Sequence, residues 1–467
     1  MNQDNQSQSD AETNGQKPPY EKPILVRHQS GLMNKFGRAQ SLQPMGAIDG
    51  VAIEDLVAEY GSPVFVFSEQ TLVDRYHELY DALTRRYAKV RMAWSYKTNY
   101  LEAICKIFHR EGAWAEVVSE FEYEKALEMG VPAHRIHFNG PLKPRPVLEK
   151  ALTSGTLVHI DHFDELSLAE KIAREREITP KVAIRLNLSA EGVPPWSRFG
   201  FNLESGQARD AVRRIVAGGQ LELTGLHCHM GTFLTDPEGY REETAKLARF
   251  ANYIRDEHGL NMSFLDVGGG IPSHNKLKAQ YLPGDQNTPA MSRFAEAITD
   301  GLSHLDYPAD EMPTLVLENG RALVDDAGYL VTTVQANKRL PDGRRGVVVD
   351  AGVNILFTSF WYDHDVVPTH RLEGTPEPTV FYGPLCMNID VVRDTMLFPP
   401  VDVGERLVLR NVGAYNVTQW MQFITYRPNV VLIGPDGQHD VIRRAENLDV
   451  VERLGSGAGE GVGPGVV

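Results

Sequence analysis

Short hydrophobic runs and longer amphipathic stretches alternate along the chain between Pro63 and about Asn319. The amphipathic stretches, such as FEYEKALEM and DELSLAEKIARERE, have helical spacing and strong helix formers. The hydrophobic runs are short, which is typical of strands buried on both faces of a sheet. Eight such strands are predicted, at residues 91–96, 113–118, 135–139, 157–161, 181–187, 223–229, 264–268 and 314–319.

The number and order of these units predict the fold class. Strands that alternate with helices form parallel sheets, and eight strand–helix units are the number found in a closed barrel. We therefore expect an α/β fold with a (β/α)8 TIM-like barrel over residues 61–327. A doubly wound open sheet is the structural alternative. The eighth strand is not followed by an obvious long helix.

The pattern changes after Gly328, where helical spacing stops. Hydrophobic runs separated by Gly, Pro and Asp turns predict a mainly-β domain over residues 328–453. Residues 24–60 contain more turn residues than periodicity, and we expect them to join this β domain. Polar composition predicts a disordered tail over residues 1–23, and Gly-rich composition predicts a flexible tail over residues 454–467.

Composition and charge narrow the function class. The chain has 47 Lys and Arg against 62 Asp and Glu, a net charge of -15, which disfavours binding to nucleic acids or anionic membranes. It has no run of 18 apolar residues and no signal-peptide core. The three cysteines, Cys105, Cys228 and Cys386, are too few for a disulfide framework. We expect a cytoplasmic protein with reduced thiols.

Charged and imidazole side chains gather where the predicted barrel strands end. The C-terminal ends of barrel strands meet on one rim, so these side chains are expected in one active site. The alternative explanation is that a strand becomes polar where it leaves the core. This explains any single polar residue well, but it explains the whole set less well. The set consists of Lys97, Glu116, Arg185, His227, His229, Glu318 and Arg321.

Two features of this rim indicate a phosphate group and a reactive amine. A glycine triplet at residues 268–270 and Asn-Gly-Arg at residues 319–321 follow strands seven and eight, where barrels often bind phosphate. Lys97 follows an apolar strand, where burial and a cationic neighbour would lower its pKa and favour a Schiff base. A lysine that extends from the rim into solvent is the alternative. Together the two features indicate pyridoxal 5′-phosphate (PLP).

A series of motifs in this chain resembles the barrel-type (fold type III) PLP-dependent decarboxylases, the family of diaminopimelate and ornithine decarboxylases. The resemblance extends from about Asp49 to Asp449. The motifs are YKTN (96–99), EVVS (116–119), SRFGF (197–201), GLHCHMGT (225–232), LDVGGGIP (265–272), ENGR (318–321), YDH (362–364), GPLC (383–386) and GAY (413–415). The resemblance implies an amino-acid decarboxylase, a carboxy-lyase, that works as a homodimer with shared active sites.

The resemblance also implies roles for individual residues. Lys97 is implied to carry the cofactor, His229 to stack on its ring, and Cys386 to act as the catalytic acid across the dimer interface. Glu318 is implied to pair with the pyridine nitrogen, which favours decarboxylation over racemisation. The other positions implied to surround the cofactor are Glu116, Arg185, Thr232, Gly268, Gly269, Gly270, Gly320, Arg321 and Tyr415. We expect no metal ion.

Three departures from the family pattern bear on the substrate. Asn319 stands where the family usually has proline. Met387 stands where an acidic residue usually contacts the substrate's distal amine, although Asp363 or Asp390 could compensate. Thr358 stands where diaminopimelate decarboxylases have an arginine that clamps the distal carboxylate, and a hydroxyl cannot replace that bidentate contact.

These departures predict a small-molecule substrate other than free diaminopimelate. We expect an N-acylated or citrylated diamino acid, as in siderophore biosynthesis, or an amino acid linked to a carrier protein. True meso-diaminopimelate decarboxylation in lysine biosynthesis is the alternative. The residues expected to contact the substrate are Arg321, Thr358, Tyr362, Asp363, Met387 and Asp390.

Three other functions are disfavoured. Glu318 argues against an amino-acid racemase. Metal-dependent barrel hydrolases usually place a His-x-His pair on the first strand, whereas His227 and His229 lie on the sixth. Non-catalytic PLP-carrying barrel proteins lack a β domain, which this chain is predicted to have.

Overall fold

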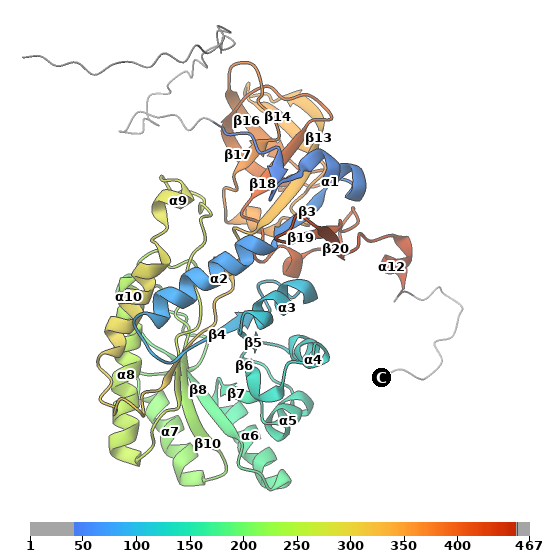
Figure 1. The fold of residues 1–467 in the computed structure, drawn as a ribbon. Coiled ribbons are helices and arrows are strands. Elements are labelled where there is room, and N and C mark those ends of the chain that lie inside the picture. The colour runs from blue at the N-terminus through green and yellow to red at the C-terminus, as the bar shows by residue number, and fades with distance from the viewer. Residues whose placement is uncertain (1–41, 454, 456–467) are drawn as a thin grey trace, which may run out of the picture.

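The computed structural model describes residues 42–453 and residue 455. It consists of a barrel and a β-rich domain placed against one end of the barrel (Figure 1). The tail expected at residues 1–23, and all but one residue of the tail expected at 454–467, lie outside the described residues. Within the described residues, no helix combines the length and apolarity needed to cross a membrane. A cytoplasmic location stays a prediction.

The eight predicted barrel strands are all present and pair in parallel. They are β4 (Val90–Ser95), β5 (Trp114–Val117), β6 (Ile136–Phe138), β7 (Leu157–Ile160), β8 (Lys181–Asn187), β10 (Glu222–Cys228), β11 (Phe264–Asp266) and β12 (Thr314–Leu317). β12 pairs with β4 and β8 pairs with β10, which closes the sheet. The short strand β9 (Phe201–Asn202) only extends β8. The (β/α)8 barrel is therefore confirmed and the open sheet is wrong.

Helices surround the barrel on its outer face. They are α3 (Glu102–Arg110), α4 (Glu120–Glu128), α5 (Arg145–Ser154), α6 (Phe163–Arg176), α7 (Gln207–Gly218), α8 (Glu238–His258) and α10 (Met291–Leu302). After β12 there is only the single turn α11 (Arg321–Val324). The open place in the ring is filled by α2 (Glu69–Thr84), which precedes β4 and packs against both α10 and α3. The helix missing after strand eight is thus supplied from before strand one.

The β domain is built on one mixed sheet, ordered β17-β16-β14-β13-β3-β19-β20, with β18 also pairing with β13 and β15. Its strands are β3 (Val64–Ser68), β13 (Gly328–Arg339), β14 (Arg345–Val349), β15 (Val366–Pro368), β16 (Glu377–Tyr382), β17 (Val391–Phe398), β18 (Arg406–Arg410), β19 (Val430–Ile433) and β20 (His439–Arg443). β3 is completely buried between β13 and β19. Residues 64–68 therefore lie in the β-domain sheet, although the expected boundary at residue 61 assigned them to the barrel.

The described part of the N-terminal segment packs on the β domain. It forms a separate hairpin of β1 (Ala47–Ile48) and β2 (Val51–Ala52), followed by α1 (Ile53–Tyr60). Buried apolar residues of α1, including Ile53 and Leu56, share one hydrophobic cluster with Val66 and Val331 of the sheet. This segment therefore covers a face of the sheet and adds no strand to it. Small elements elsewhere are α9 (Gly284–Asn287) and α12 (Leu448–Glu452).

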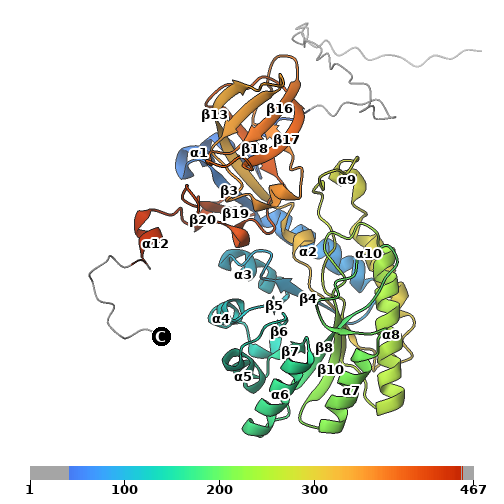
Figure 2. The same cartoon turned by 180° about the vertical axis from the view of Figure 1, so that it is seen from behind.

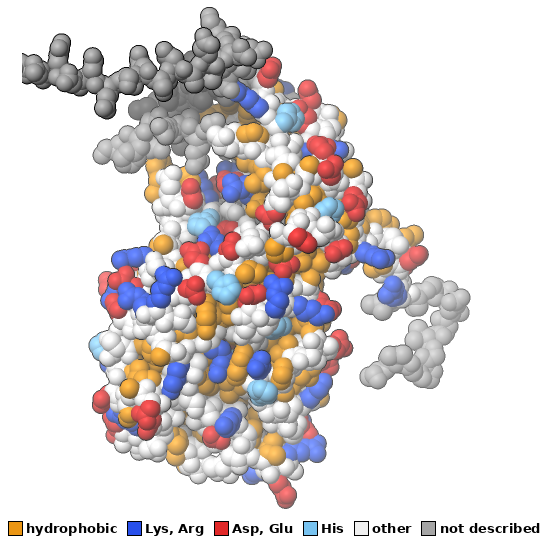
Figure 3. Space-filling model, in the orientation of Figure 1, with side chains coloured by type: hydrophobic (Ala, Val, Ile, Leu, Met, Phe, Trp, Pro, Cys, Tyr) orange, Lys and Arg blue, Asp and Glu red, His pale blue; other side chains and the backbone are white. Residues whose placement is uncertain are grey.

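The two domains meet at the rim of the barrel where its strands end (Figure 2). Acidic and basic side chains are interspersed on the face that Figure 3 shows, with no single sign dominating it. The strand ends and the loops that follow them therefore lie beneath the β domain, where the candidate residues of the sequence were expected.

Candidate active site

A cavity of about 560 Å³ opens between the rim of the barrel and the β domain. Trp361, Tyr362, Tyr415 and Gln419 line it from the β domain, so that both domains build it. The predicted site residues that it brings together are Lys97, Glu116, Arg185, His227, His229, Thr232, Gly269, Gly270, Glu318, Gly320, Arg321, Tyr362 and Tyr415. Gly268 is adjacent in the chain to this lining.

Lys97 belongs to a hydrogen-bonded group of buried polar residues. Its Nζ donates to Glu116 Oε2 at 2.6 Å, and Ser95 Oγ donates to the same oxygen at 2.5 Å. Asn139 Nδ2 donates to Glu116 Oε1 at 3.0 Å and to Glu318 Oε1 at 2.6 Å, which joins the two carboxylates. The sequence did not point to Asn139 and Ser95 as site residues. For Asn139 a signal was available, because it is a polar residue at the end of the predicted strand IHFN.

The electrostatics of Lys97 differ from the expectation. Burial acts to lower its pKa, but the negative charges of Glu116, Tyr415 and Glu318 outweigh burial and raise the pKa above its ordinary value. The predicted lowering is therefore wrong for this structure, because the groups in reach are carboxylates and not cations. The Lys97 side chain, 37% exposed, faces the cavity, and Glu116 is placed to accept its proton.

The glycine loop after β11 fixes His229 in one protonation state. The backbone N–H of Gly269 donates to His229 Nδ1 at 3.0 Å, so the ring proton of the neutral imidazole lies on Nε2. Burial, followed by the charges of Arg185 and Lys97, holds the pKa of His229 well below its ordinary value. The edge of Trp196 contacts the ring, with the centroids 5.2 Å apart. His229 therefore presents a neutral, fixed aromatic ring to the cavity.

The same loop has room only for glycine. A Cβ at Gly268 would lie 2.7 Å from the His229 side chain, and one at Gly269 would lie 2.5 Å from the Glu318 carbonyl oxygen. A Cβ at Gly270 would lie 2.4 Å from the carbonyl oxygen of Gly231, and its φ of +105° is a region that other residues rarely adopt. Such bare, close-packed backbone suits the approach of a phosphate.

Arg321 is a buried cation with unused donors. Its side chain is 10% exposed and its Cζ lies 4.9 Å from the ring centroid of Tyr362 and 4.8 Å from that of Tyr415. Within the described residues, Nε and Nη1 have no hydrogen-bond partner, and Asp325 Oδ2 lies 3.5 Å from Nη1. A desolvated guanidinium with free N–H groups fits an anionic ligand such as a phosphate. The residues present therefore fit PLP.

Glu318 follows β12 directly and is buried on the floor of the cavity. Burial acts to raise its pKa, but the neighbouring His227, whose Nε2 lies 3.4 Å from Glu318 Oε2, lowers the pKa well below its ordinary value together with His159 and Lys97. Glu318 is therefore a buried, ionised carboxylate, and in this position its charge acts more strongly on a neighbouring group than it would in water.

Two of the predicted substrate contacts are occupied within the β domain. Thr358 is buried, and its Oγ1 hydrogen-bonds with His364 Nε2 and with Asn416 Oδ1, both at 2.9 Å. Asp363 pairs with Arg393, with 2.6 Å between Oδ1 and Nη1. Neither side chain lines the cavity, so only Tyr362 and Arg321 of the expected substrate contacts face it.

The remaining predicted site residues, Cys386, Met387 and Asp390, lie in the loop between β16 and β17. Asp390 is buried and accepts hydrogen bonds from the backbone N–H groups of Val353 at 2.8 Å and Leu385 at 2.7 Å, which holds this loop in place. Cys386 is exposed and Met387 is half-buried, and neither lines the cavity within one chain. Asp390 thus positions the loop that carries the cysteine.

Comparison with known proteins identifies the family. Residues 70–325, more than half of the chain, match the family model described as pyridoxal-dependent decarboxylase, pyridoxal binding domain. The chain belongs to the pyridoxal-dependent decarboxylase family. The resemblance inferred from the motifs, the PLP cofactor and the carboxy-lyase class are thereby confirmed.

Individual members of the family resemble this chain over nearly its whole length. The diaminopimelate decarboxylase of Methanocaldococcus jannaschii is 29% identical over 425 residues, which are 87% of this chain and 94% of that protein. The Bacillus subtilis enzyme of the same name is 26% identical over 445 residues, 92% of this chain and 98% of that one. A crystal structure of the M. jannaschii enzyme matches with a TM-score of 0.79 and 29% identity, covering 91% of this chain and 98% of that one. Another crystal structure of it, in complex with L-lysine, matches with the same TM-score.

Proposed function

We propose that this PLP-dependent decarboxylase removes one carboxylate of meso-diaminopimelate, which leaves lysine and CO2. The observation that supports the proposal is the similarity, over 85% or more of the chain, to relatives that are diaminopimelate decarboxylases. This similarity supports the alternative of the sequence analysis better than its main expectation, a modified diamino acid.

The residues of the cavity have distinct parts in this proposal. When bound, PLP supplies the electron sink that accepts the electron pair of the leaving carboxylate. Lys97 holds the cofactor, and Glu116 takes the lysine proton across their 2.6 Å hydrogen bond. The ionised Glu318 would hold a proton on the pyridine nitrogen of bound PLP, and the neutral ring of His229 would lie against the cofactor.

Other residues of the cavity are placed to bind the phosphate and to orient the cofactor. Arg321, the glycine loop and Thr232 hold the phosphate, because unpaired guanidinium donors and bare backbone lie there. Arg185 lies over Phe199, with its Cζ 4.4 Å from the ring centroid, and lines the same cavity as Glu116, where it would orient the bound cofactor.

Product mass spectrometry with the purified, PLP-loaded protein tests the substrate. The panel contains meso-diaminopimelate, lysine, ornithine, arginine, an N-citryl diamino acid and an aminoacyl carrier protein. We expect loss of CO2 from meso-diaminopimelate with formation of lysine. Turnover of another panel member with no turnover of diaminopimelate would contradict the proposal, and a Lys97→Ala variant provides the blank.

A modified diamino acid is the second candidate, and one observation favours it. Thr358 is buried with both of its hydrogen-bonding partners in place, and the half-buried Met387 carries no charge, so neither can bind a distal carboxylate or ammonium. A substrate whose distal end is capped, as in siderophore assembly, or tethered to a carrier would not need those contacts. The same mass-spectrometric panel distinguishes the two candidates.

We further propose a homodimer in which Cys386 serves the cavity of the partner subunit. The exposed loop of Cys386 and Ile389 is tied to residues 353–354, which also bind the segment around Phe423. Exposed apolar residues cluster there: Ile389 (55%), Phe423 (42%), Ile424 (56%) and Tyr426 (50%). Surfaces of this kind mark interfaces between subunits.

Mixing two inactive variants tests the shared site. Lys97→Ala and Cys386→Ala variants each lack activity, but randomly assorted heterodimers contain one complete site in a head-to-tail dimer, so about a quarter of the wild-type activity returns. No recovery after verified subunit exchange would contradict the shared site. Sedimentation measures the dimer independently.

A further inference from the structure

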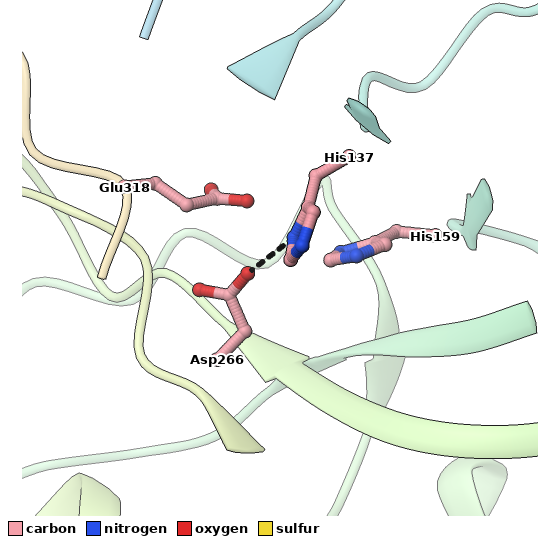
Figure 4. Close-up of side chains that lie close together, drawn as sticks. All are labelled: His137, His159, Asp266 and Glu318. Atoms are coloured by element: carbon pink, nitrogen blue, oxygen red, sulfur yellow. Dashed lines mark hydrogen bonds and ion pairs between the residues drawn. The ribbon is translucent and has the colours of Figure 1, made fainter. Parts of the chain in front are cut away.

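A second buried carboxyl group, that of Asp266 at the end of β11, lies next to Glu318. Its side chain has no exposure to solvent, and it points toward those of Glu318, His137 and His159 (Figure 4). One oxygen or nitrogen atom of each of these four side chains lies within 4.8 Å of those of the other three. Two acidic groups this close together in a buried place do not both ionise unless a cation compensates them.

Asp266 has no cation at hydrogen-bonding distance. Among the described residues, no lysine or arginine forms an ion pair with it, and the basic group that pairs with it is His137, whose Nδ1 lies 3.3 Å from Oδ2. Burial lowers the pKa of His137 to about 3, so this imidazole is neutral. Arg91 on β4 acts on Asp266 only at longer range, while Glu318 and Glu116 face it with negative charge.

Glu318 has the partners that Asp266 lacks. Asn139 Nδ2 donates to its Oε1 at 2.6 Å, and His227 Nε2 lies 3.4 Å from its Oε2. Although burial opposes ionisation, the charges of His227, His159 and Lys97 hold its pKa well below the ordinary value. Glu318 is therefore the ionised member of the pair.

The proton of the pair lies on Asp266. Burial, and then the charge of Glu318, raise the pKa of Asp266 well above its ordinary value, and the two side chains share a hydrogen bond. Oδ1 accepts from the backbone N–H of Gly268 at 2.9 Å, which leaves the proton to Oδ2, the oxygen on the side of His137 and Glu318 (Figure 4). Asp266 is therefore a hydrogen-bond donor beneath the carboxylate.

We propose that Asp266 is a positioning residue that keeps its proton and donates a hydrogen bond to Glu318, so that Glu318 stays ionised and aimed at the pyridine nitrogen of bound PLP. A charge-assisted O–H···O⁻ bond is strong, and it lowers the proton affinity of the carboxylate that accepts it. The proton between Glu318 and the pyridine nitrogen then stays on the nitrogen, where it makes the ring a better electron sink. The inference rests on the role given to Glu318 in the proposed function, and not on which substrate is decarboxylated.

Two substitutions at Asp266 distinguish a protonated acid from an ionised one. Asp266→Val keeps the forked shape and removes the donor, and we expect turnover to fall by about 10–100-fold, because a hydrogen bond to a charged group is lost. Asp266→Asn keeps an acceptor for Gly268 and a neutral N–H donor for Glu318. We expect this conservative variant to rescue turnover to within about fivefold of wild type, because a hydrogen bond of similar kind remains.

The protonation of the cofactor is measured without substrate. Each protein is loaded with PLP that carries ¹⁵N in its ring, and the solid-state ¹⁵N chemical shift over a pH series shows where the pyridine nitrogen loses its proton. We expect Asp266→Val to lose this proton at a lower pH than wild type, and Asp266→Asn to follow wild type. In a Glu318→Gln background, Asp266→Val should have no further effect, because Asp266 acts through Glu318.

Stability measurements test the charge of Asp266 independently. Asp326 is a largely buried aspartate that pairs with Arg75 and His274, and despite burial these two groups lower its pKa, so it is ionised. Asp326→Asn breaks these ion pairs and should lower the midpoint of urea unfolding at a fixed PLP concentration. Asp266→Asn exchanges one neutral group for another and should leave the midpoint unchanged or raise it.

The proposal is overturned if Asp266→Val keeps the wild-type ¹⁵N shift over the whole pH series, which would mean that Asp266 only supports the glycine loop through Gly268. It is also overturned if Asp266→Asn loses as much turnover as Asp266→Val, or lowers the urea midpoint as Asp326→Asn does, since Asp266 would then act as an ion. Circular dichroism verifies folding, and the Asp266→Asn results decide the question if Asp266→Val does not fold.

These outcomes are distinct from those that test the substrate. Turnover is measured with whichever member of the panel loses CO2, so a substrate other than diaminopimelate refutes the proposed substrate only. A wild-type ¹⁵N shift in Asp266→Val refutes this inference only. A wild-type ¹⁵N shift in Glu318→Gln refutes the role of Glu318 and this inference together.

Discussion

Glu122 offers a quantitative test of the electrostatics around the active site. It lies in the first turn of α4, is 6% exposed, and accepts a hydrogen bond from the Val118 N–H at 2.8 Å. Burial, and then the charge of Glu116, raises its pKa from an ordinary 4.5 to about 7. The folded state therefore binds the Glu122 proton more tightly than the unfolded state does. The associated stability is lost as pH rises from 4.5 to 7.

The Glu122→Gln variant removes this ionisation and keeps the size of the side chain. The pKa difference of about 2.5, at 1.36 kcal/mol for each pKa unit, predicts a variant more stable than wild type by about 3 kcal/mol at pH 8. At pH 5 the predicted difference falls below about 1 kcal/mol. Urea unfolding at fixed protein and PLP concentrations, repeated at four pH values, measures the difference.

The control for this experiment is Glu120→Gln, which changes an exposed glutamate in the same helical turn. We expect its stability to follow that of wild type at every pH, because exposed charges contribute little. A Glu122→Gln variant whose advantage over wild type does not grow between pH 5 and pH 8 would refute the assigned burial cost.

Three further substitutions and one chemical probe test the site. Lys97→Ala should lose PLP on gel filtration and at least about a thousandfold in turnover, with its circular dichroism unchanged. Gly270→Ala should weaken PLP binding at least about tenfold by fluorescence titration, because its Cβ would lie 2.4 Å from a carbonyl oxygen. Arg321→Lys should weaken inorganic phosphate and PLP binding by about 10–100-fold, since one point charge replaces a fork of donors. A thiol reagent should modify one cysteine per native chain, Cys386, because the other two are buried; equal labelling of a Cys386→Ser variant would contradict this.

Much of the barrel could be predicted from the sequence because hydrophobic period and polar strand ends are local signals. The rim residues Lys97, His229 and Arg321 followed from the rule that parallel strands end on one face. In the β domain the signal is weaker: β17 lies at the edge of the sheet and carries Arg393 and Asp394 in the middle of its sequence. A strand that is partly exposed on both faces shows no regular alternation of apolar and polar residues, so its sequence alone does not predict it.

Other features depended on distant contacts. The raised pKa of Lys97 arises from Glu116 on the neighbouring strand β5, from Tyr415 and from Glu318, and Glu318 is brought close only because β12 pairs with β4 and closes the barrel. Thr358 was expected in the site from its alignment, but its hydroxyl is hydrogen-bonded to Asn416, 58 positions away. The eighth helix could not be found after strand eight, because α2 supplies it from the opposite end of the barrel sequence.

The position of β3 has a consequence for synthesis of the chain. This largely apolar strand emerges from the ribosome before the barrel, yet its neighbours β13 and β19 begin only at Gly328 and Val430. At about 5–20 residues per second, the first of these partners follows roughly 13–50 s later. During that interval VFVFS has two unpaired edges, a template for association between nascent chains. The barrel is thus an insertion between β3 and β13, and its length sets how long β3 waits for its first partner strand.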